Sequence, residues 1–220
     1  MSNPTFLHQL AKEILKTNSE NLSELVIVLP NKRAKVFLLD ELKKLVSTNV
    51  FAPEIISIEE FIQDIAGIRS IDSVEVLFEF YEVYLSITEK NQESFETFAN
   101  WAKTLLQDFN EIDRYLLDPK YVLSYLKDIE DIKKWGLEVD QKTKLLENYI
   151  DFWKLLPMYY DSLYAHLLHK SIGYQGLIYR EAVNNLNHFS NSIQKKQFVF
   201  AGFNALNAAE EKIIQHLIAT

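Results

Sequence analysis

Five consecutive apolar residues, Leu25–Leu29, place the strongest constraint on the fold of this chain. A continuous run that is rich in valine and isoleucine is typical of a strand buried on both faces, as in a parallel sheet. Pro30 ends this strand, and Asn31 is a good N-cap for a helix that we predict over residues 32–46. The sequence therefore predicts a central parallel strand followed directly by a helix.

The segments around this strand follow an α/β order. Residues 6–16 place their apolar side chains on one helical face, and residues 54–57 predict a second short strand. Ser57, with Glu60 three residues later, predicts a capping box at the start of the next helix. The order helix, strand, helix, strand, helix indicates an α/β fold.

The middle of the chain changes character, because residues 72–191 show almost only helical periodicity. We expect five or six helices here. The stretch "QFVFAGF" then returns to a strand, and a last helix is predicted from about Asn207. The chain ends within or just after that helix, so we expect it to be part of a longer protein. The expected breaks between the central helices are Pro119, Gly136, Pro157, Gly173 and Gly176.

Composition narrows the cellular setting. The chain has no cysteine, which excludes disulfides and thiolate metal sites and fits a reducing cytoplasm. No apolar run approaches the length of about 18 residues that a membrane span needs. The N-terminus lacks the apolar core and cleavage site of a signal peptide. We therefore expect a cytoplasmic protein with no membrane contact.

Charge is unevenly distributed along the chain. The net charge is −8, which argues against a protein that coats nucleic acid nonspecifically. Residues 1–50 nevertheless hold seven Lys/Arg against five Asp/Glu, whereas the remaining 170 residues hold 16 against 26. Any contact with DNA or RNA is therefore expected in the first segment.

The sequence shows no nucleotide-hydrolysis motif. A phosphate-binding loop reads G-x-x-x-x-G-K-[ST], because backbone N–H groups and a lysine must surround the phosphates. The connection after the first strand reads "LPNKRAKVF", without glycine, and no other stretch matches. No Ser/His/Asp arrangement stands out either. We therefore expect no ATP hydrolysis, no catalytic residue and no cofactor in these residues.

The stretch "PNKRAK" is the most informative local feature. Lys32, Arg33 and Lys35 fall in the first turn of the predicted helix, where the helix dipole disfavours each exposed cation by roughly 0.3–1 kcal/mol. Free N–H groups and cations at the carboxyl end of a strand form an anion site, such as one for a nucleic-acid phosphate. The alternative is an ordinary helix start with solvated lysines. The residues alone leave both interpretations open for Asn31, Lys32, Arg33 and Lys35.

Three other groups have weaker functional interpretations. His166 and His169 have a spacing found in metal sites, but no third ligand is obvious, so we expect a surface or partly packed pair and no metal. The acids of "DFNEID" could bind Mg²⁺, but a solvated acidic face is the expectation for Asp108, Glu111 and Asp113. Several tyrosines could stack on bases, but their helical spacing favours core or interface positions. These tyrosines are Tyr159, Tyr160, Tyr164, Tyr174 and Tyr179.

Five pieces of the chain together resemble a known family. In chain order they are "VIVLPNKRAKVFLLDEL", "IISIEEFI", "WAKTLLQDFNEIDRYLLD", "GYQGLIYREAV" and "FVFAGFNALNAAEEKI". They resemble the AddB-type subunit of bacterial helicase–nuclease complexes, and more closely its Bacteroidetes relatives known as PD-(D/E)XK nuclease family proteins. The pieces span nearly the whole chain, and the first, third and last together are fairly specific.

The resemblance implies a superfamily 1 helicase-like α/β fold, a P-loop-NTPase (RecA-like) parallel sheet without a Walker A motif. Residues 1–67 plus 196–220 would form the RecA-like domain, and residues 68–195 a large all-helical insertion domain, so the chain would be predominantly helical. "LPNKRA" would take the place of a helicase motif that contacts the single strand, and Ser57 would lie at the next strand end.

The resemblance also implies a lost metal site. Ala201 and Gly202 stand where an active helicase carries its Mg²⁺-binding Asp-Glu pair. The AddB-type pattern usually reads Asp-Gly-Phe there, so Ala201 departs even from these relatives. The nuclease motif and iron–sulfur cysteines of the family would lie C-terminal of residue 220.

Two functions from different classes remain after this reasoning. The first is a catalytically inactive helicase-like N-terminal region of a DNA-repair and recombination helicase–nuclease protein. It would act as a scaffold and contact a DNA single strand or duplex end, with an ATPase partner subunit. The alternative is a helical protein–protein interaction module with no nucleic-acid contact, which the net charge of −10 beyond residue 50 favours.

Overall fold

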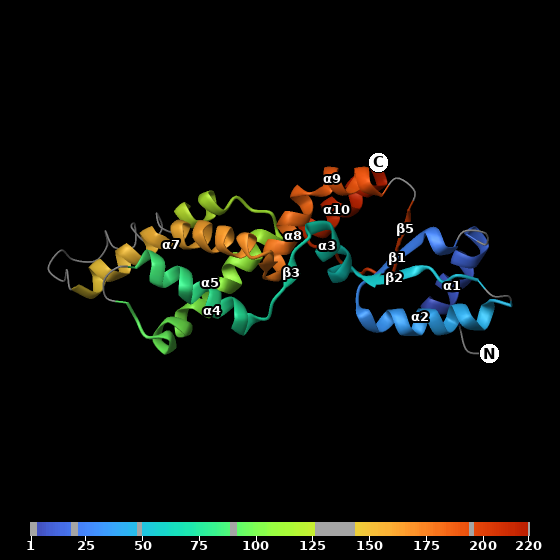
Figure 1. Ribbon diagram of the computed structural model, residues 1–220, viewed down its shortest axis with the longest axis horizontal. Helices are drawn as coiled ribbons and strands as arrows, with labels where there is room; N and C mark the ends of the chain where they lie inside the picture. Colours follow the sequence, from blue (N-terminus) through green and yellow to red (C-terminus); the bar gives the residue numbers. More distant parts are fainter. Residues whose placement is uncertain are drawn as a thin grey trace.

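The computed structural model of this protein describes residues 4–18, 22–47, 50–88, 92–125, 144–193 and 196–219, with only the backbone described for 144–153. It is mostly helical and contains a small three-stranded parallel sheet. Figure 1 shows an elongated molecule, with the sheet and helices α1 and α2 near one end and helices α4, α5 and α7 toward the other. The N-terminus lies near α1 and α2, and the C-terminus lies beside α9 and α10 (Figure 1).

The sheet consists of β1 (Leu25–Leu29), β2 (Glu54–Ser57) and β5 (Gln197–Phe200) in the order β2-β1-β5, with both pairings parallel. All five residues of β1 are buried. The prediction of a central parallel strand is therefore confirmed, as is the late return of the chain to the sheet.

The described helices lie close to the predicted ranges. Residues 119–125 are also helical, and a short 3-10 helix covers Leu22–Glu24. The α-helices are α1 (Phe6–Thr17), α2 (Lys32–Leu45), α3 (Ile58–Ala66), α4 (Ser73–Ile87), α5 (Phe95–Arg114), α7 (Lys144–His169), α8 (Gln175–Asn184), α9 (Leu186–Ser192) and α10 (Ala208–Ala219).

Helices cover both faces of the sheet, because alternate strand residues point to opposite sides. Leu25, Ile27 and Leu29 pack in one cluster with α1 and α2. Val26 and Val28 face a second cluster, which includes residues of α3, α8, α9 and α10. The result is a three-layer α/β/α arrangement at one end of the molecule (Figure 1).

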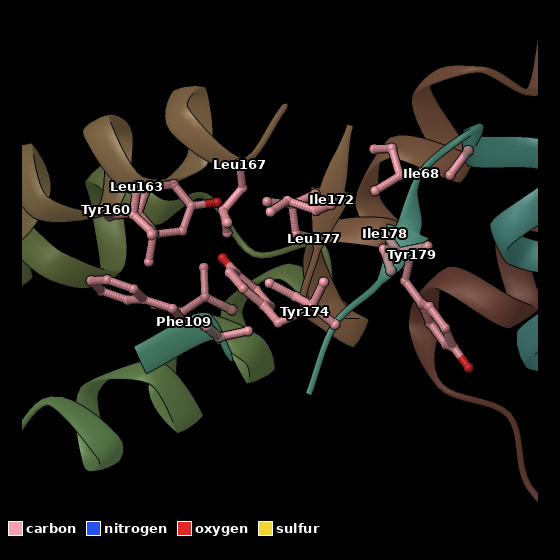
Figure 2. Packing of buried hydrophobic residues seen from close by; sticks show 14 of the residues in the cluster. Ile68, Phe109, Tyr160, Leu163, Leu167, Ile172, Tyr174, Leu177, Ile178 and Tyr179 are labelled. Carbon is pink, nitrogen blue, oxygen red and sulfur yellow. The ribbon is translucent and has the colours of Figure 1, made fainter. Parts of the chain in front are cut away.

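The second cluster continues without interruption into the helical block. α8 packs against α5 on one side and against α3 and α10 on the other. β3 (Arg69–Ser70) pairs in parallel with β4 (Ile172–Gly173), which was not predicted. This short ladder joins the segment before α4 to the segment between α7 and α8. Figure 2 shows core side chains from both sides of this junction. The expected boundary around residues 68–195 thus runs through one continuous core.

Two predicted breaks lie inside helices, and one lies outside the described residues. Gly173 lies in β4 between α7 and α8, as predicted, whereas Gly176 is the second residue of α8. Pro157 lies inside α7 rather than between two helices. Its missing N–H removes one helical hydrogen bond, but the helix continues because Leu156, Tyr159 and Tyr160 are all buried around it. Pro119 does begin a helical segment. Gly136 falls within residues 126–143, which are not described.

Candidate nucleic-acid interface

The parallel topology brings the predicted site residues to one edge of the sheet. Asn31 follows β1, Ser57 is the last residue of β2, and Ala201 and Gly202 follow β5. Because the three strands run in the same direction, their carboxyl ends meet at this edge, which is where open α/β sheets bind ligands. We call this region the carboxyl edge.

Asn31 and Lys32 connect the start of α2 to its surroundings. The Asn31 side-chain oxygen accepts a hydrogen bond from the Ala34 N–H at 3.1 Å, so Asn31 is the N-cap that the sequence predicted. The Lys32 ammonium lies 3.2 Å from the Glu60 carboxylate on α3. Lys32 therefore forms an ion pair within the chain, and this pair links α2 to α3.

Ser57 is part of a buried capping box. Its hydroxyl accepts a hydrogen bond from the Glu60 N–H at 3.2 Å, and the Glu60 carboxylate accepts one from the Ser57 N–H at 3.0 Å. The predicted capping box is confirmed. Because the Ser57 side chain is fully buried, it has no surface to offer a ligand, and we leave it out of the interface proposed below.

Arg33 and Lys35 differ from Lys32. Both side chains are exposed, and neither forms an ion pair with any described residue. The acids further along α2 are already engaged, because Lys44 lies 2.7 Å from Asp40 and 2.8 Å from Glu41. The first turn of α2 therefore carries two exposed cations whose charge the described part of the chain does not neutralise.

Apolar atoms surround Ala201 and Gly202, the positions that the resemblance would align with the helicase metal acids. The Ala201 N–H donates a hydrogen bond to the Val28 carbonyl at 3.1 Å, and the Ala201 side chain packs on the cluster beneath α1 and α2. Gly202 has a φ of +82°, and a side chain there would begin 3.3 Å from the ring of Phe6. A carboxylate side chain at position 201 would contact apolar atoms. Any side chain at position 202 would strain the backbone.

Sequence reasoning missed Phe37, which lies one turn after Arg33 on α2. Its side chain is 62% exposed, and that of the neighbouring Val36 is 67% exposed. A signal was present in the sequence, because Leu38 and Leu42 define the apolar stripe of this helix and both exposed residues lie off that stripe. Large apolar side chains on the outer face of an amphipathic helix need a separate explanation.

A second group of ligand atoms lies between α4 and α7. Carboxylate oxygens of Glu79 and Glu82 and a ring nitrogen of His166 all lie within 4.8 Å of one another. The Lys170 ammonium lies 2.5 Å from Glu79 and 3.3 Å from Glu82, so a cation of the chain itself already occupies this position. His169 is exposed. The prediction of a surface or partly packed histidine pair is confirmed. The ion pairs of this cluster connect α4 and α7.

Asp113 is the centre of a buried polar network. Its carboxylate accepts hydrogen bonds from the hydroxyls of Tyr160 and Tyr174, the latter at 2.5 Å, and from the Arg180 Nε at 2.6 Å. Figure 2 shows the two tyrosine hydroxyls converging from opposite sides. Burial raises the pKa of Asp113, and these three donors act against that rise. The arrangement joins α5, α7 and α8.

This network corrects one prediction and confirms another. The expected solvated acidic face is right for Asp108 and Glu111, which are exposed, but wrong for Asp113, because α7 and α8 cover it. The tyrosines are in the core, as expected. Tyr159, Tyr160, Tyr174 and Tyr179 are buried, and Tyr164 is half-buried.

The structure also contains a hollow of about 530 Å³ along α5 and the helical residues 119–125. Its described lining is mainly apolar, with Asp108 and Glu111 as the charged members. Because no cation is among these lining residues, the hollow is not suited to a phosphate. The carboxyl edge therefore remains the better candidate for contact with an anion.

No family model matches the chain, and a search of curated proteins gives no match. Within the described residues, none of the helices is both long and apolar enough to cross a membrane.

Proposed function

We propose that this chain is the catalytically inactive, helicase-like N-terminal region of a DNA-repair and recombination helicase–nuclease protein. Its carboxyl edge would contact DNA, and its helical block would serve as a scaffold. An ATPase partner subunit in the cytoplasm would supply the motor activity. In this proposal residues 1–67 plus 196–220 form a RecA-like domain, and residues 68–195 form its helical insertion.

The arrangement of the chain supports the RecA-like assignment. A parallel sheet with helices on both faces is the architecture of nucleotide-binding α/β folds. The third strand returns beside β1 only after the helical block, which is the order that the resemblance implies. The positions of the lost Asp-Glu pair follow that third strand.

The observation that carries the proposal is the pair of exposed cations at the carboxyl edge. Arg33 and Lys35 lie at the start of a helix, where the dipole disfavours them, and the described residues offer them no acid. The chain as a whole is acidic, with a net charge of −8. An anion such as a backbone phosphate would relieve this local excess of positive charge.

The test is DNA binding measured by fluorescence anisotropy with a labelled single strand, at salt concentrations between about 50 and 200 mM. The variant is Arg33→Glu/Lys35→Glu. Lys32 is left intact, because a glutamate there would face Glu60 and disturb the capping box. A matched control is Lys12→Glu/Lys16→Glu on α1, which makes the same charge change at exposed positions.

The proposal expects salt-sensitive binding by the wild type and by the control. The Arg33→Glu/Lys35→Glu variant should bind more weakly at each salt concentration, and its salt slope should fall by about one for each lost phosphate contact. Equal binding by all three proteins would remove the carboxyl edge from consideration. Absence of wild-type binding at low salt would reject DNA contact altogether.

One observation favours the alternative, a protein–protein interaction module. On the helical block, Phe78 of α4 is 54% exposed and stacks on Phe95 of α5 with ring centroids 4.6 Å apart. Val74, one turn earlier on the same face, is 60% exposed. Exposed aromatic and aliphatic side chains at helical spacing are typical of a protein contact surface.

The two functions make opposite predictions for this aromatic surface. If the chain is only a protein–protein interaction module, the wild type should bind no DNA, and replacing Phe78 and Val74 with serine should abolish its association with the partner protein. If the DNA proposal alone holds, the same variant should behave like the wild type in both assays. Size-exclusion chromatography with the candidate ATPase subunit measures the first effect, and anisotropy measures the second.

A further inference from the structure

The outer face of α2 exposes the aromatic ring of Phe37 close to the cations of the first turn. Phe37 is four residues after Arg33, so the two side chains lie on the same face of the helix, separated by a rise of about 6 Å. Asp40, the next acid on this face, is held by Lys44 at 2.7 Å. The surface around Phe37 therefore combines an exposed aromatic ring with a guanidinium that none of the described acids neutralises.

We propose that Phe37 stacks on an unpaired base whose neighbouring phosphate is bound by Arg33, so that the ligand of this surface is single-stranded nucleic acid. This inference rests on the proposed function and narrows it, because it selects a single strand over a duplex end. The contact surface consists of Arg33, Lys35 and Phe37.

Base stacking explains the exposure of Phe37 better than nonspecific phosphate contact does. Proteins that bind single strands combine cations that follow the backbone with aromatic side chains on which bases stack. A duplex already stacks its bases internally and presents phosphates outward, so it would use the two cations and leave the ring unused. The pairing of ring and cation therefore points to a strand with accessible bases.

The charge of this surface favours a polyanion over a protein helix. Lys32, Arg33 and Lys35 begin α2, and residues 1–50 carry a net charge of +2, whereas the rest of the chain carries −10. An apolar protein partner would gain from the exposed Val36 as well as from Phe37, because the two side chains are 67% and 62% exposed. A nucleic acid would gain from the aromatic ring alone. Val36 is therefore the matched control for the ring.

The experiment measures binding of a labelled 15-residue thymidine oligomer and of a blunt duplex of equal length, both at low salt, to four proteins. These are the wild type, Phe37→Ala, Val36→Ala and Phe37→Trp. Because the substituted side chains are on the surface, thermal unfolding should show the same midpoint for all four within a few degrees. A third probe is an abasic oligomer with the same number of phosphates.

If Phe37 stacks on a base, Phe37→Ala should weaken thymidine-oligomer binding by roughly five- to 150-fold, which is the range expected for the loss of one stacked base. Val36→Ala and Phe37→Trp should bind like the wild type. Duplex binding should not change with Phe37→Ala. On the abasic oligomer, the difference between Phe37→Ala and the wild type should disappear.

The outcomes separate this inference from the function on which it rests. Phe37→Ala binding within twofold of the wild type, while Arg33→Glu/Lys35→Glu binding is lost, would reject stacking and keep the DNA contact. Equal losses of thymidine-oligomer binding with Phe37→Ala and Val36→Ala would reject stacking, because an aliphatic side chain offers no ring to a base. Failure of the wild type to bind either probe would reject the proposed function and the stacking with it.

Discussion

Two regions of this molecule bring charged groups together, and they do so in opposite ways. Between α5, α7 and α8, the Asp113 carboxylate is buried and accepts hydrogen bonds from two tyrosines and Arg180. At the start of α2, Arg33 and Lys35 are exposed and have no acidic partner among the described residues. The first region satisfies its charges within the chain and holds the fold, whereas the second carries positive charge that the described residues do not pair.

The comparison predicts that mutations in the first region affect stability and that mutations in the second affect binding. Removing one member of a buried, hydrogen-bonded charge pair leaves its partner uncompensated, which is costly. Exposed side chains away from such features usually change stability by less than about 0.5 kcal/mol.

Asp113→Ala should lower the free energy of unfolding by about 3–5 kcal/mol, because Arg180 and two tyrosine hydroxyls lose their acceptor in the core. Urea unfolding monitored by circular dichroism measures the effect. Asp108→Ala, an exposed acid on the same helix, is the control and should change stability little. A loss below about 1 kcal/mol for Asp113→Ala would contradict the structural role of the network.

Gly176→Ala tests the packing next to this network. A Cβ at Gly176 would lie 2.2 Å from the backbone carbonyl oxygen of Asn110, so α8 must move away from α5. We expect a loss of about 1–3 kcal/mol, the usual cost of overpacking. Ala182→Gly, on the same helix, serves as a comparison that removes a methyl instead of adding one. A Gly176→Ala protein as stable as the wild type would show that the two helices separate easily.

The smallest effect is expected at the boundary between the two regions, where Glu60 accepts the Ser57 N–H and pairs with Lys32. The Ser57 backbone donor, followed by Lys32, holds the pKa of Glu60 below its ordinary value of 4.5. A lowered folded-state pKa stabilises the fold above the ordinary value, and this contribution is lost as the pH falls through the folded-state pKa.

Urea unfolding of the wild type and Glu60→Gln between about pH 3 and pH 7 measures this contribution. The difference in unfolding free energy should be constant near neutral pH and should shrink as the pH falls below the ordinary pKa of a glutamate, about 4.3–4.5. A difference that does not change with pH would indicate that Glu60 acts through its shape and hydrogen bond alone.

Local sequence determined the elements that frame the carboxyl edge. The run Leu25–Leu29 is buried from end to end as the central strand, Asn31 caps α2, and Ser57 with Glu60 forms the predicted capping box. These features depend on neighbours within a few residues, so periodicity and capping preferences are enough to predict them.

Tertiary structure decided which charged and aromatic groups are accessible. The helical pattern around Asp113 looked solvated until α7 and α8 covered it, and Pro157 looked like a break until the buried side chains beside it held α7 together. Likewise, Lys32 and Arg33 are adjacent in sequence, yet among the described residues only Lys32 of the two meets an acid, because the sheet brings Glu60 beside the start of α2. Burial and pairing depend on residues far apart in the chain, which is why local patterns could not assign them.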